Sequence, residues 1–221
     1  MLLRCLSLCR RPLVLLLCLL PMWSFSLELK GELVQGGMLI GQVTPGEQVE
    51  IMGRPVRVDD QGLFVFGLGR DAPAEIKLTH TNGGNEVTTF SYAVEQRVYR
   101  EQRVEGVPQK TVTPPPEVLD ISAPTGTEVF APAPGVVTLV HRDMFYSGGT
   151  LLIDHGYGIS STFIHLSELL VEEGQQVAPG DPVARVGATG RATGPHLDWR
   201  INWFDVRLDP ALVLDQFPAA K

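Results

Sequence analysis

Short apolar segments alternate with turn residues along most of the chain. Between residues 27 and 98, apolar segments such as Val49–Ile51 and Leu63–Phe66 are separated by turn sequences such as Gly36-Gly37 and Asp60-Gln61-Gly62. Strands at a spacing of roughly ten residues, with turn residues between them, are typical of a small β-sandwich. We therefore predict a small all-β N-terminal domain, similar to a β-sandwich, over residues 27–98.

The same pattern returns over residues 120–215. Apolar, β-branched segments at Val129–Ala131, Gly135–Val140 and Thr150–Ile153 predict strands. Helical periodicity never extends beyond about ten residues, which is too short for a stable independent helix. Only Leu166–Val171 is expected to form one helical turn. The second domain is therefore also predicted to be all-β.

Residues 99–119 predict a proline-rich junction between these domains. Pro114, Pro115 and Pro116 stiffen the backbone and donate no hydrogen bonds. Proline followed by glutamate and apolar residues usually opens a helix, so Pro116–Leu119 is expected to do so. This helix start runs directly into strand and turn residues at Asp120, which is a local conflict.

Residues 1–26 predict a secretory signal. A basic part, a short apolar run and small residues before Leu27 form the pattern, and they comprise Arg4, Arg10, Arg11, Leu13–Leu20, Ser24 and Ser26. An uncleaved anchor is the alternative, but the run is shorter than the roughly 20 residues of a membrane-spanning helix. No later segment is apolar enough, so no stable membrane span is expected after cleavage.

Cysteine use and charge narrow the function classes further. Cys5, Cys9 and Cys18 all lie in the predicted signal, so the mature chain would contain no disulfide, thiolate metal site or cysteine nucleophile. This fits a protein of the bacterial periplasm or extracellular envelope. After residue 26, 15 basic residues stand against 25 acidic ones, a formal charge of −10. Such an acidic body argues against nucleic acid as a partner.

Two segments carry candidate chemistry, Ser161–Leu166 and Gly190–Asp198. In a strand, residues i and i+2 face the same side, so His196 and Asp198 are expected to point together into one groove. A histidine and a carboxylate in that arrangement suit metal binding and proton transfer. The glycines nearby would let a substrate backbone approach closely.

Several motifs, in order and at matching spacing, resemble the lysostaphin/LytM-type family of peptidoglycan metalloendopeptidases. The matching segments are Asp120–Thr127, Ala133–Val137, Ile153–Gly158, Phe163–Leu166, Val177–Asp181 and Gly187–Leu197. The resemblance implies an antiparallel β-sheet groove, one zinc ion, and cleavage of peptide bonds in peptidoglycan cross-bridges or stems.

The resemblance also implies roles for individual residues. Asp120 matches the aspartate ligand of the family's first metal motif, and His165 and His196 match its two catalytic histidines. Asp198 stands where the family has its last zinc-binding histidine, and an aspartate oxygen can also bind zinc. For substrate binding we predict Arg191 and Gly194 in the glycine-rich loop, although Arg191 in solvent is an equal alternative.

The chain departs from the family at the first metal motif, His-x-Gly-x-Asp. Pro116 occupies the histidine position and Val118 the glycine position. Asp120 and Asp198 alone fall short of the three protein ligands of a catalytic zinc site, and two close carboxylates without a metal repel each other.

Three explanations remain open. A segment with the missing histidine has been lost between Leu119 and Asp120, or the chain is a natural pseudoenzyme, or His155 or His141 supplies the ligand. Two functions follow. One is a periplasmic zinc metalloendopeptidase acting on peptidoglycan, inactive if the ligand is truly missing. The other is a non-catalytic LytM-type regulator that binds cell wall or activates a wall amidase.

A third function class, a biotinyl- or lipoyl-carrier-like barrel, is suggested by the hairpin pattern of Val177–Val186. A carrier needs a lysine at the turn between its strands, and this segment is followed by Ala188–Arg191 without one. We therefore set this class aside.

Overall fold

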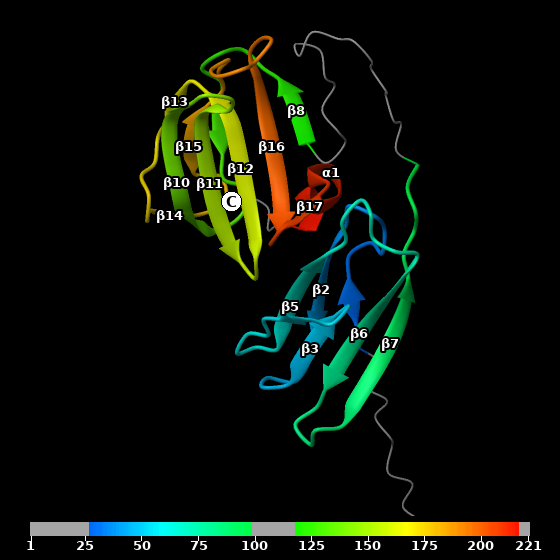
Figure 1. Cartoon of the computed structure of the whole chain (residues 1–221). Coiled ribbons are helices and arrows are strands. Elements are labelled where there is room, and N and C mark those ends of the chain that lie inside the picture. The colour runs from blue at the N-terminus through cyan, green and yellow to red at the C-terminus, as the bar shows by residue number, and fades with distance from the viewer. Residues whose placement is uncertain (1–26, 99–117, 217–221) are drawn as a thin grey trace, which may run out of the picture.

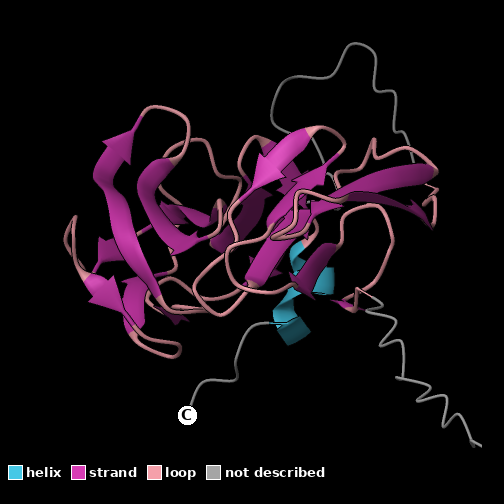
Figure 2. Ribbon diagram, turned by 90° about the horizontal axis from the view of Figure 1, so that it is seen from below, coloured by secondary structure: helices cyan, strands magenta, loops and turns pink. Residues whose placement is uncertain are grey.

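The computed structural model describes residues 27–98 and 118–216, and strands dominate both segments (Figures 1 and 2). The predicted all-β class is confirmed. The predicted signal and most of the proline-rich junction lie outside the described residues. No helix in the described segments is long and apolar enough to cross a membrane.

The N-terminal part forms two antiparallel sheets, as a small sandwich requires. One contains β1 (Leu29–Lys30), β2 (Met38–Gln42) and β5 (Leu63–Gly67); the other has the order β4 (Arg54–Val56), β3 (Gln48–Ile51), β6 (Glu75–Thr81) and β7 (Val87–Ala93). Alternation explains these strands: in β6, Ile76 and Leu78 are buried while Glu75 and Lys77 are exposed.

The C-terminal part is built on a seven-stranded antiparallel sheet. Its path is β14 (Gln176–Val177), β10 (Gly135–Met144), β11 (Gly148–Gly156), β12 (Ile159–Leu166), β16 (His196–Trp203) and β17 (Val206–Leu208), and β8 (Val118–Ser122) also pairs with β16. β8 and β17 thus share β16, with β8 paired to residues 196–200 and β17 to residues 201–203. Figure 1 shows β8 beside β16.

Strand β8 corrects one expectation. Instead of opening a helix, Val118 begins a strand that pairs with β16 over five consecutive residue pairs. Leu119 and Asp120 therefore lie inside an uninterrupted strand, at the position where one of the three explanations places a lost segment. Pairing with β16 supplies backbone hydrogen bonds at every second residue, which outweighs the weak helical preference of so short a segment.

A second, three-stranded sheet covers the first. Its order is β13 (Glu168–Leu169), β15 (Pro182–Arg185) and β9 (Glu128–Phe130). The helical turn expected at Leu166–Val171 is wrong, because Glu168 and Leu169 pair with Arg185 and Ala184 of β15. The chain then closes with α1 (Pro210–Val213) and the short 3₁₀ helix η1 (Leu214–Gln216).

The N-terminal sandwich packs against the β17 and α1 end of the C-terminal part (Figure 1). Gly67 of β5 lies so close that an added Cβ would meet Leu208 at 2.6 Å and Trp203 at 2.9 Å. Arg97 reaches across to Asp209, with 2.7 Å between Nη1 and Oδ2. Asp209 also caps α1 by accepting a hydrogen bond from the amide of Ala211. These contacts join the two parts at the C-terminal end of β16, seven residues along the strand from His196.

Candidate active site

The candidate site is built on the polar face of β16, which carries His196, Asp198, Arg200 and Asn202. The opposite face carries Leu197, Trp199, Ile201 and Trp203, and the last three are buried in the core. As the alternation predicts, His196 and Asp198 lie on the same face. Neighbouring strands bring further residues to this face, because directly paired residues of an antiparallel sheet share a side.

Register places Asp120 directly opposite Asp198. The pairing of β8 with β16 sets Asp198 against Asp120 and His196 against Ser122. Side chains in such pairs have Cβ atoms roughly 5 Å apart. Asp120 is exposed, whereas Asp198 is only 5% exposed because Ile164 of β12 flanks it on the other side. The two predicted metal ligands therefore stand side by side.

The two predicted catalytic histidines also come together. The ring centroids of His165 and His196 are 4.9 Å apart. His165 Nδ1 donates a hydrogen bond to the carbonyl of Thr189, and His196 Nδ1 donates one to the carbonyl of Gly194, both at 2.8 Å. These bonds fix the ring orientations and leave each Nε2 without a hydrogen bond to any described residue. Both rings thus present the nitrogen that a metal, a water or a peptide would contact.

The loop that holds these histidines depends on close glycine packing. His165 itself has a positive φ of 62°, at the point where β12 meets residues 187–190. An added Cβ on Gly190 would lie 2.4 Å from the amide nitrogen of Gly148, and one on Gly148 would lie 2.2 Å from Thr189 Oγ1. The carbonyl that accepts from His165 is therefore positioned by a contact that only glycine permits.

The predicted substrate-binding residues occupy the same loop. Arg191 lies over the ring of Tyr146, with 5.4 Å between its guanidinium carbon and the ring centroid. Its amide also donates to the carbonyl of Tyr146. Gly194 has open space where a side chain would be, and its carbonyl orients His196. Their roles in substrate binding remain predictions.

Asp198 is bound to Arg200, a contact that the sequence reasoning missed. Both oxygens of Asp198 accept hydrogen bonds from the guanidinium, at 2.7 Å to Nε and 2.7 Å to Nη2. The hydrogen bond with Asp198 raises the pKa of Arg200 despite the opposing effect of burial. The sequence contained the indication for this contact, because residues i and i+2 share a strand face and Arg200 follows Asp198 by two residues.

Comparison with known proteins decides the family. The profile described as Peptidase family M23 matches residues 116–210. The crystal structure of a Pseudomonas aeruginosa protein assigned to peptidase M23 superposes with a TM-score of 0.65 and 30% identity, covering 84% of this chain and 96% of that one. The chain belongs to peptidase family M23.

Two curated relatives are peptidases by their names. The chain is 39% identical over 82 residues to peptidoglycan DD-endopeptidase ShyA of Vibrio cholerae, and 43% identical over 86 residues to DD-carboxypeptidase/endopeptidase Mpg of Neisseria meningitidis. These matches cover 37% and 38% of this chain, and 19% and 20% of the relatives. The matched part thus spans about a fifth of each relative.

The other histidines do not complete an M23 metal site. His155 lies on the core side of β11, where Nδ1 donates to the carbonyl of Pro134 and Nε2 accepts from Ser161, at 2.9 and 2.8 Å. Burial lowers the pKa of His155, outweighing the hydrogen bond to Pro134 and the charge of Asp154, so the ring is neutral. His141 is exposed on β10, and its Nδ1 accepts from the amide of Asp143. The explanation that either histidine replaces the missing ligand is not supported.

The donor set of the polar face does not fit zinc. No group of three His, Cys, Asp or Glu residues within the described segments is arranged to hold a metal ion. All five histidines are in those segments, and Pro116, at the family's histidine position, supplies no ligand. Both oxygens of Asp198 are held by Arg200, which leaves only Asp120 from the predicted ligand set.

Proposed function

We propose that this protein binds peptidoglycan peptides on the polar face of its M23 sheet, in the cell envelope, and does not cut them through zinc. The observation that carries this proposal is the two-fold hydrogen bonding of Asp198 by Arg200. An M23 scaffold whose last ligand position holds an aspartate, bound by an arginine two residues further along the strand, keeps the fold of the site while changing its chemistry.

The ion pair opposes metal binding for an electrostatic reason. A cation near Asp198 would displace the guanidinium and leave Arg200 as an unpaired, partly buried charge beside it. The side chain of Arg200 is 33% exposed and that of Asp198 is 7% exposed, so water screens the pair only in part. Catalytic zinc requires three protein ligands, and Asp120 alone is insufficient.

The rest of the site still suits a peptide. His165 and His196 each present an Nε2 atom, which accepts a hydrogen bond when neutral and donates one when protonated. Arg191 next to this pair offers a cation for a carboxylate of a stem peptide. Peptidoglycan is the proposed ligand class because the curated relative ShyA is named as a peptidoglycan DD-endopeptidase.

Location and organisation form part of the same proposal. Residues 1–26 would direct export to the periplasm, residues 27–98 and 120–215 would be the two domains, and residues 99–119 would connect them. A non-catalytic wall-binding domain of this kind would act as a regulator, for example by activating a separate wall amidase.

A zinc endopeptidase is the competing function, and one observation favours it. Asp120 faces Asp198 across the β8–β16 pair, beside two histidines with rings 4.9 Å apart. That arrangement is what a metal-activated water would need around it. Loss of an internal segment before Asp120 would reconcile this arrangement with the missing histidine.

Metal content and turnover separate the two functions. The purified protein, dialysed against zinc and then against buffer, is assayed for bound zinc by mass spectrometry, for release of peptides from cell-wall sacculi, and for pelleting with sacculi. We expect pelleting without stoichiometric zinc or peptide release. Pelleting should weaken in His196→Ala, while His141→Ala, on an exposed part of β10, should behave as the unchanged protein.

A repaired chain tests whether only the ligands are missing. It combines Pro116→His, Val118→Gly and Asp198→His with Arg200→Ala, and the same chain with Asp120→Asn is its control. We expect about one zinc per repaired chain and much less in the control, since three ligands suffice for a catalytic site. Full zinc occupancy in the unchanged protein would contradict the proposal, as would peptide release that a chelator abolishes.

A further inference from the structure

The N-terminal sandwich contains a pocket that the M23 site does not use. It has a volume of about 190 Å³ and lies at the end of the sandwich where the β2–β3 loop meets β6 and β7. Its lining consists of Leu27, Gln42, Val43, Thr44, Glu47, His80, Asn82 and Phe90. No arginine or lysine is among these residues.

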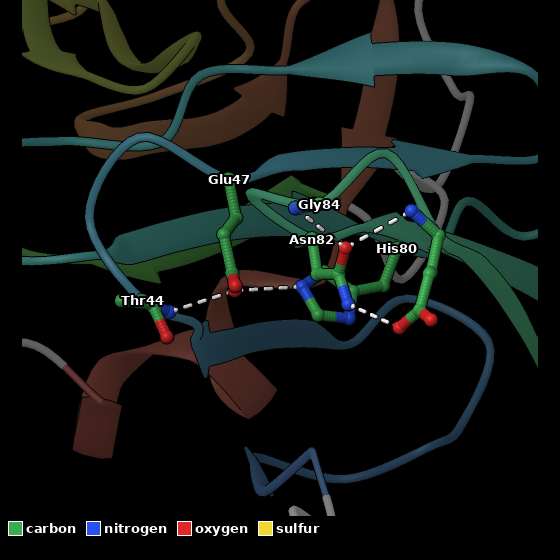
Figure 3. Close-up of polar contacts among 6 residues, drawn as sticks. Thr44, Glu47, His80, Asn82 and Gly84 are labelled. Carbon is green, nitrogen blue, oxygen red and sulfur yellow. Dashed lines mark hydrogen bonds and ion pairs between the residues drawn. The ribbon is translucent and has the colours of Figure 1, made fainter.

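A glutamate and a histidine are hydrogen-bonded in its wall (Figure 3). Glu47 Oε2 lies 2.7 Å from His80 Nε2 and accepts a second bond from the amide of Thr44 at 3.0 Å. The side chains of Glu47 and His80 are only 14% and 20% exposed. Burial alone would raise the pKa of Glu47, but hydrogen bonds from His80, Thr44 and the amide of Gly83 outweigh it and lower that pKa. Glu47 is therefore an ionised carboxylate in a sheltered place.

Acceptor atoms remain available among the polar groups that line the pocket. His80 Nε2 donates to Glu47, and His80 Nδ1, which accepts in the Nε2-protonated tautomer, has no hydrogen bond to a described residue. Gln42 Nε2 donates a hydrogen bond to the carbonyl of Gln61, and Gln42 Oε1 remains available as an acceptor. Asn82 is engaged in its own turn, where Oδ1 accepts from the amides of Gly84 and Glu86 and Nδ2 donates one hydrogen bond to the Glu86 side chain (Figure 3).

The remaining lining is apolar and sets the size of a ligand. Leu27, Val43 and Phe90 contribute hydrocarbon surface beside the acceptors. A dry apolar cavity of about 150 Å³ holds benzene, so about 190 Å³ accommodates a stem of four or five carbons with a small polar head. A donor-rich cation with such a stem satisfies the carboxylate, the acceptors and the apolar wall together.

We propose that this pocket binds a primary ammonium group carried on a short aliphatic stem, with the carboxylate of Glu47 as its counter-ion and Leu27, Val43 and Phe90 around the stem. The Glu47 carboxylate, which also accepts from the amide of Gly83, would receive the ammonium on its remaining lone pair. The ammonium donates three hydrogen bonds, which matches the acceptors of Glu47, Gln42 and His80.

Two sources supply this chemistry. One is an amine from outside, such as a lysine-like side chain of a peptide. The other is the chain itself, because removal of the predicted signal before Leu27 would create an α-ammonium on a residue that lines the pocket. Both place the same group beside Glu47, and they are distinguished by comparing a chain that begins at Leu27 with one that retains residues 24–26.

The test is titration of both chains with n-pentylammonium, 1-pentanol and pentanoate, followed by NMR amide shifts. We expect pentylammonium to shift the amides of residues 42–47 and 80–84, and the other two probes to bind far more weakly. Glu47→Gln should weaken pentylammonium binding about tenfold to a hundredfold, because a hydrogen bond to a charged group is lost. Glu50→Gln, an exposed acid of neighbouring β3, is the matched control and should bind as before.

The outcomes divide clearly. Binding to both chains assigns the pocket to an external amine, and binding only to the longer chain assigns it to the amino end at Leu27. Equal binding of pentanol and pentylammonium to the unchanged protein would overturn the proposal, and this comparison does not depend on whether Glu47→Gln folds. Failure here leaves the proposed peptidoglycan binding untouched, since the two sites share no residue.

Discussion

The two faces of β16 place different demands on the same eight residues. On one face, Trp199, Ile201 and Trp203 are at most 5% exposed and pack in the core, with Trp199 stacked on Phe163 at 6.0 Å between ring centroids. On the other, His196 lies beside His165, and Asp198 is hydrogen-bonded to Arg200. The comparison teaches that the M23 scaffold is maintained by the apolar face and is independent of the ligands on the polar face.

The largest expected effect comes from breaking the apolar face. Trp203→Ala should lower the free energy of unfolding by about 3–5 kcal/mol, because Trp203 is 2% exposed and its removal leaves a cavity. Asn202→Ala, the adjacent residue on the polar face, should cost about 1 kcal/mol through loss of its hydrogen bond with Arg207. Urea denaturation of both variants measures the difference. Equal losses of stability would contradict the conclusion that the apolar face of β16 maintains the fold independently of the polar face.

The ion pair on the polar face should give the next largest effect. Arg200→Ala leaves the Asp198 carboxylate buried without its partner and opposite Asp120. We expect a loss of about 2–3 kcal/mol, below the value for a fully buried pair because water reaches Arg200. The double variant Asp198→Asn with Arg200→Ala should recover part of that loss in the same denaturation experiment. No recovery would mean that Arg200 acts through packing alone.

A smaller effect should follow from crowding the loop that holds the histidines. Gly190→Ala introduces a Cβ 2.4 Å from the amide nitrogen of Gly148 at a φ of 67°, so the loop must shift at a cost of about 1–2 kcal/mol. Gly194→Ala meets no heavy atom within 4 Å and should change stability by less than about 0.5 kcal/mol. Thermal melting of both variants checks this prediction. A loss in Gly194→Ala as large as that in Gly190→Ala would refute the steric argument.

His155 should contribute to the pH dependence of stability, which is the smallest effect. Because the pKa of His155 is lowered on folding, the unfolded chain binds a proton more readily than the folded one below the ordinary value of 6.5. Its stabilisation is therefore present above pH 6.5 and is lost as the pH falls from 6.5 through the lower folded pKa. His155→Gln should flatten the stability profile in that window, measured by urea denaturation at successive pH values. An unchanged slope would contradict a neutral, buried His155.

Much of the fold followed from local patterns. The strands of the sandwich and the central sheet coincide with apolar alternation, for example in Leu63–Phe66 and Thr150–Ile153. The two errors fell where local preference is weak. Pro116–Leu119 and Leu166–Val171 are too short to form a helix against the competition of an available strand edge, which β16 and β15 supply.

The sequence by itself determined the family, the all-β class and the absence of a histidine four residues before Asp120, because motif spacing and alternation are properties of neighbouring residues. Only the tertiary structure decided that Asp120 stands opposite Asp198, that His155 faces the core, and that Glu47 and His80 meet in a pocket. The first depends on strand register between segments far apart in the chain, and the other two depend on how neighbouring strands and loops pack in the folded protein. The ion pair of Asp198 and Arg200 depends on both the sequence and the fold. Arg200 lies two residues from Asp198 in the sequence. The folded strand places both side chains in a sheltered site, where their attraction outweighs the cost of removing them from water.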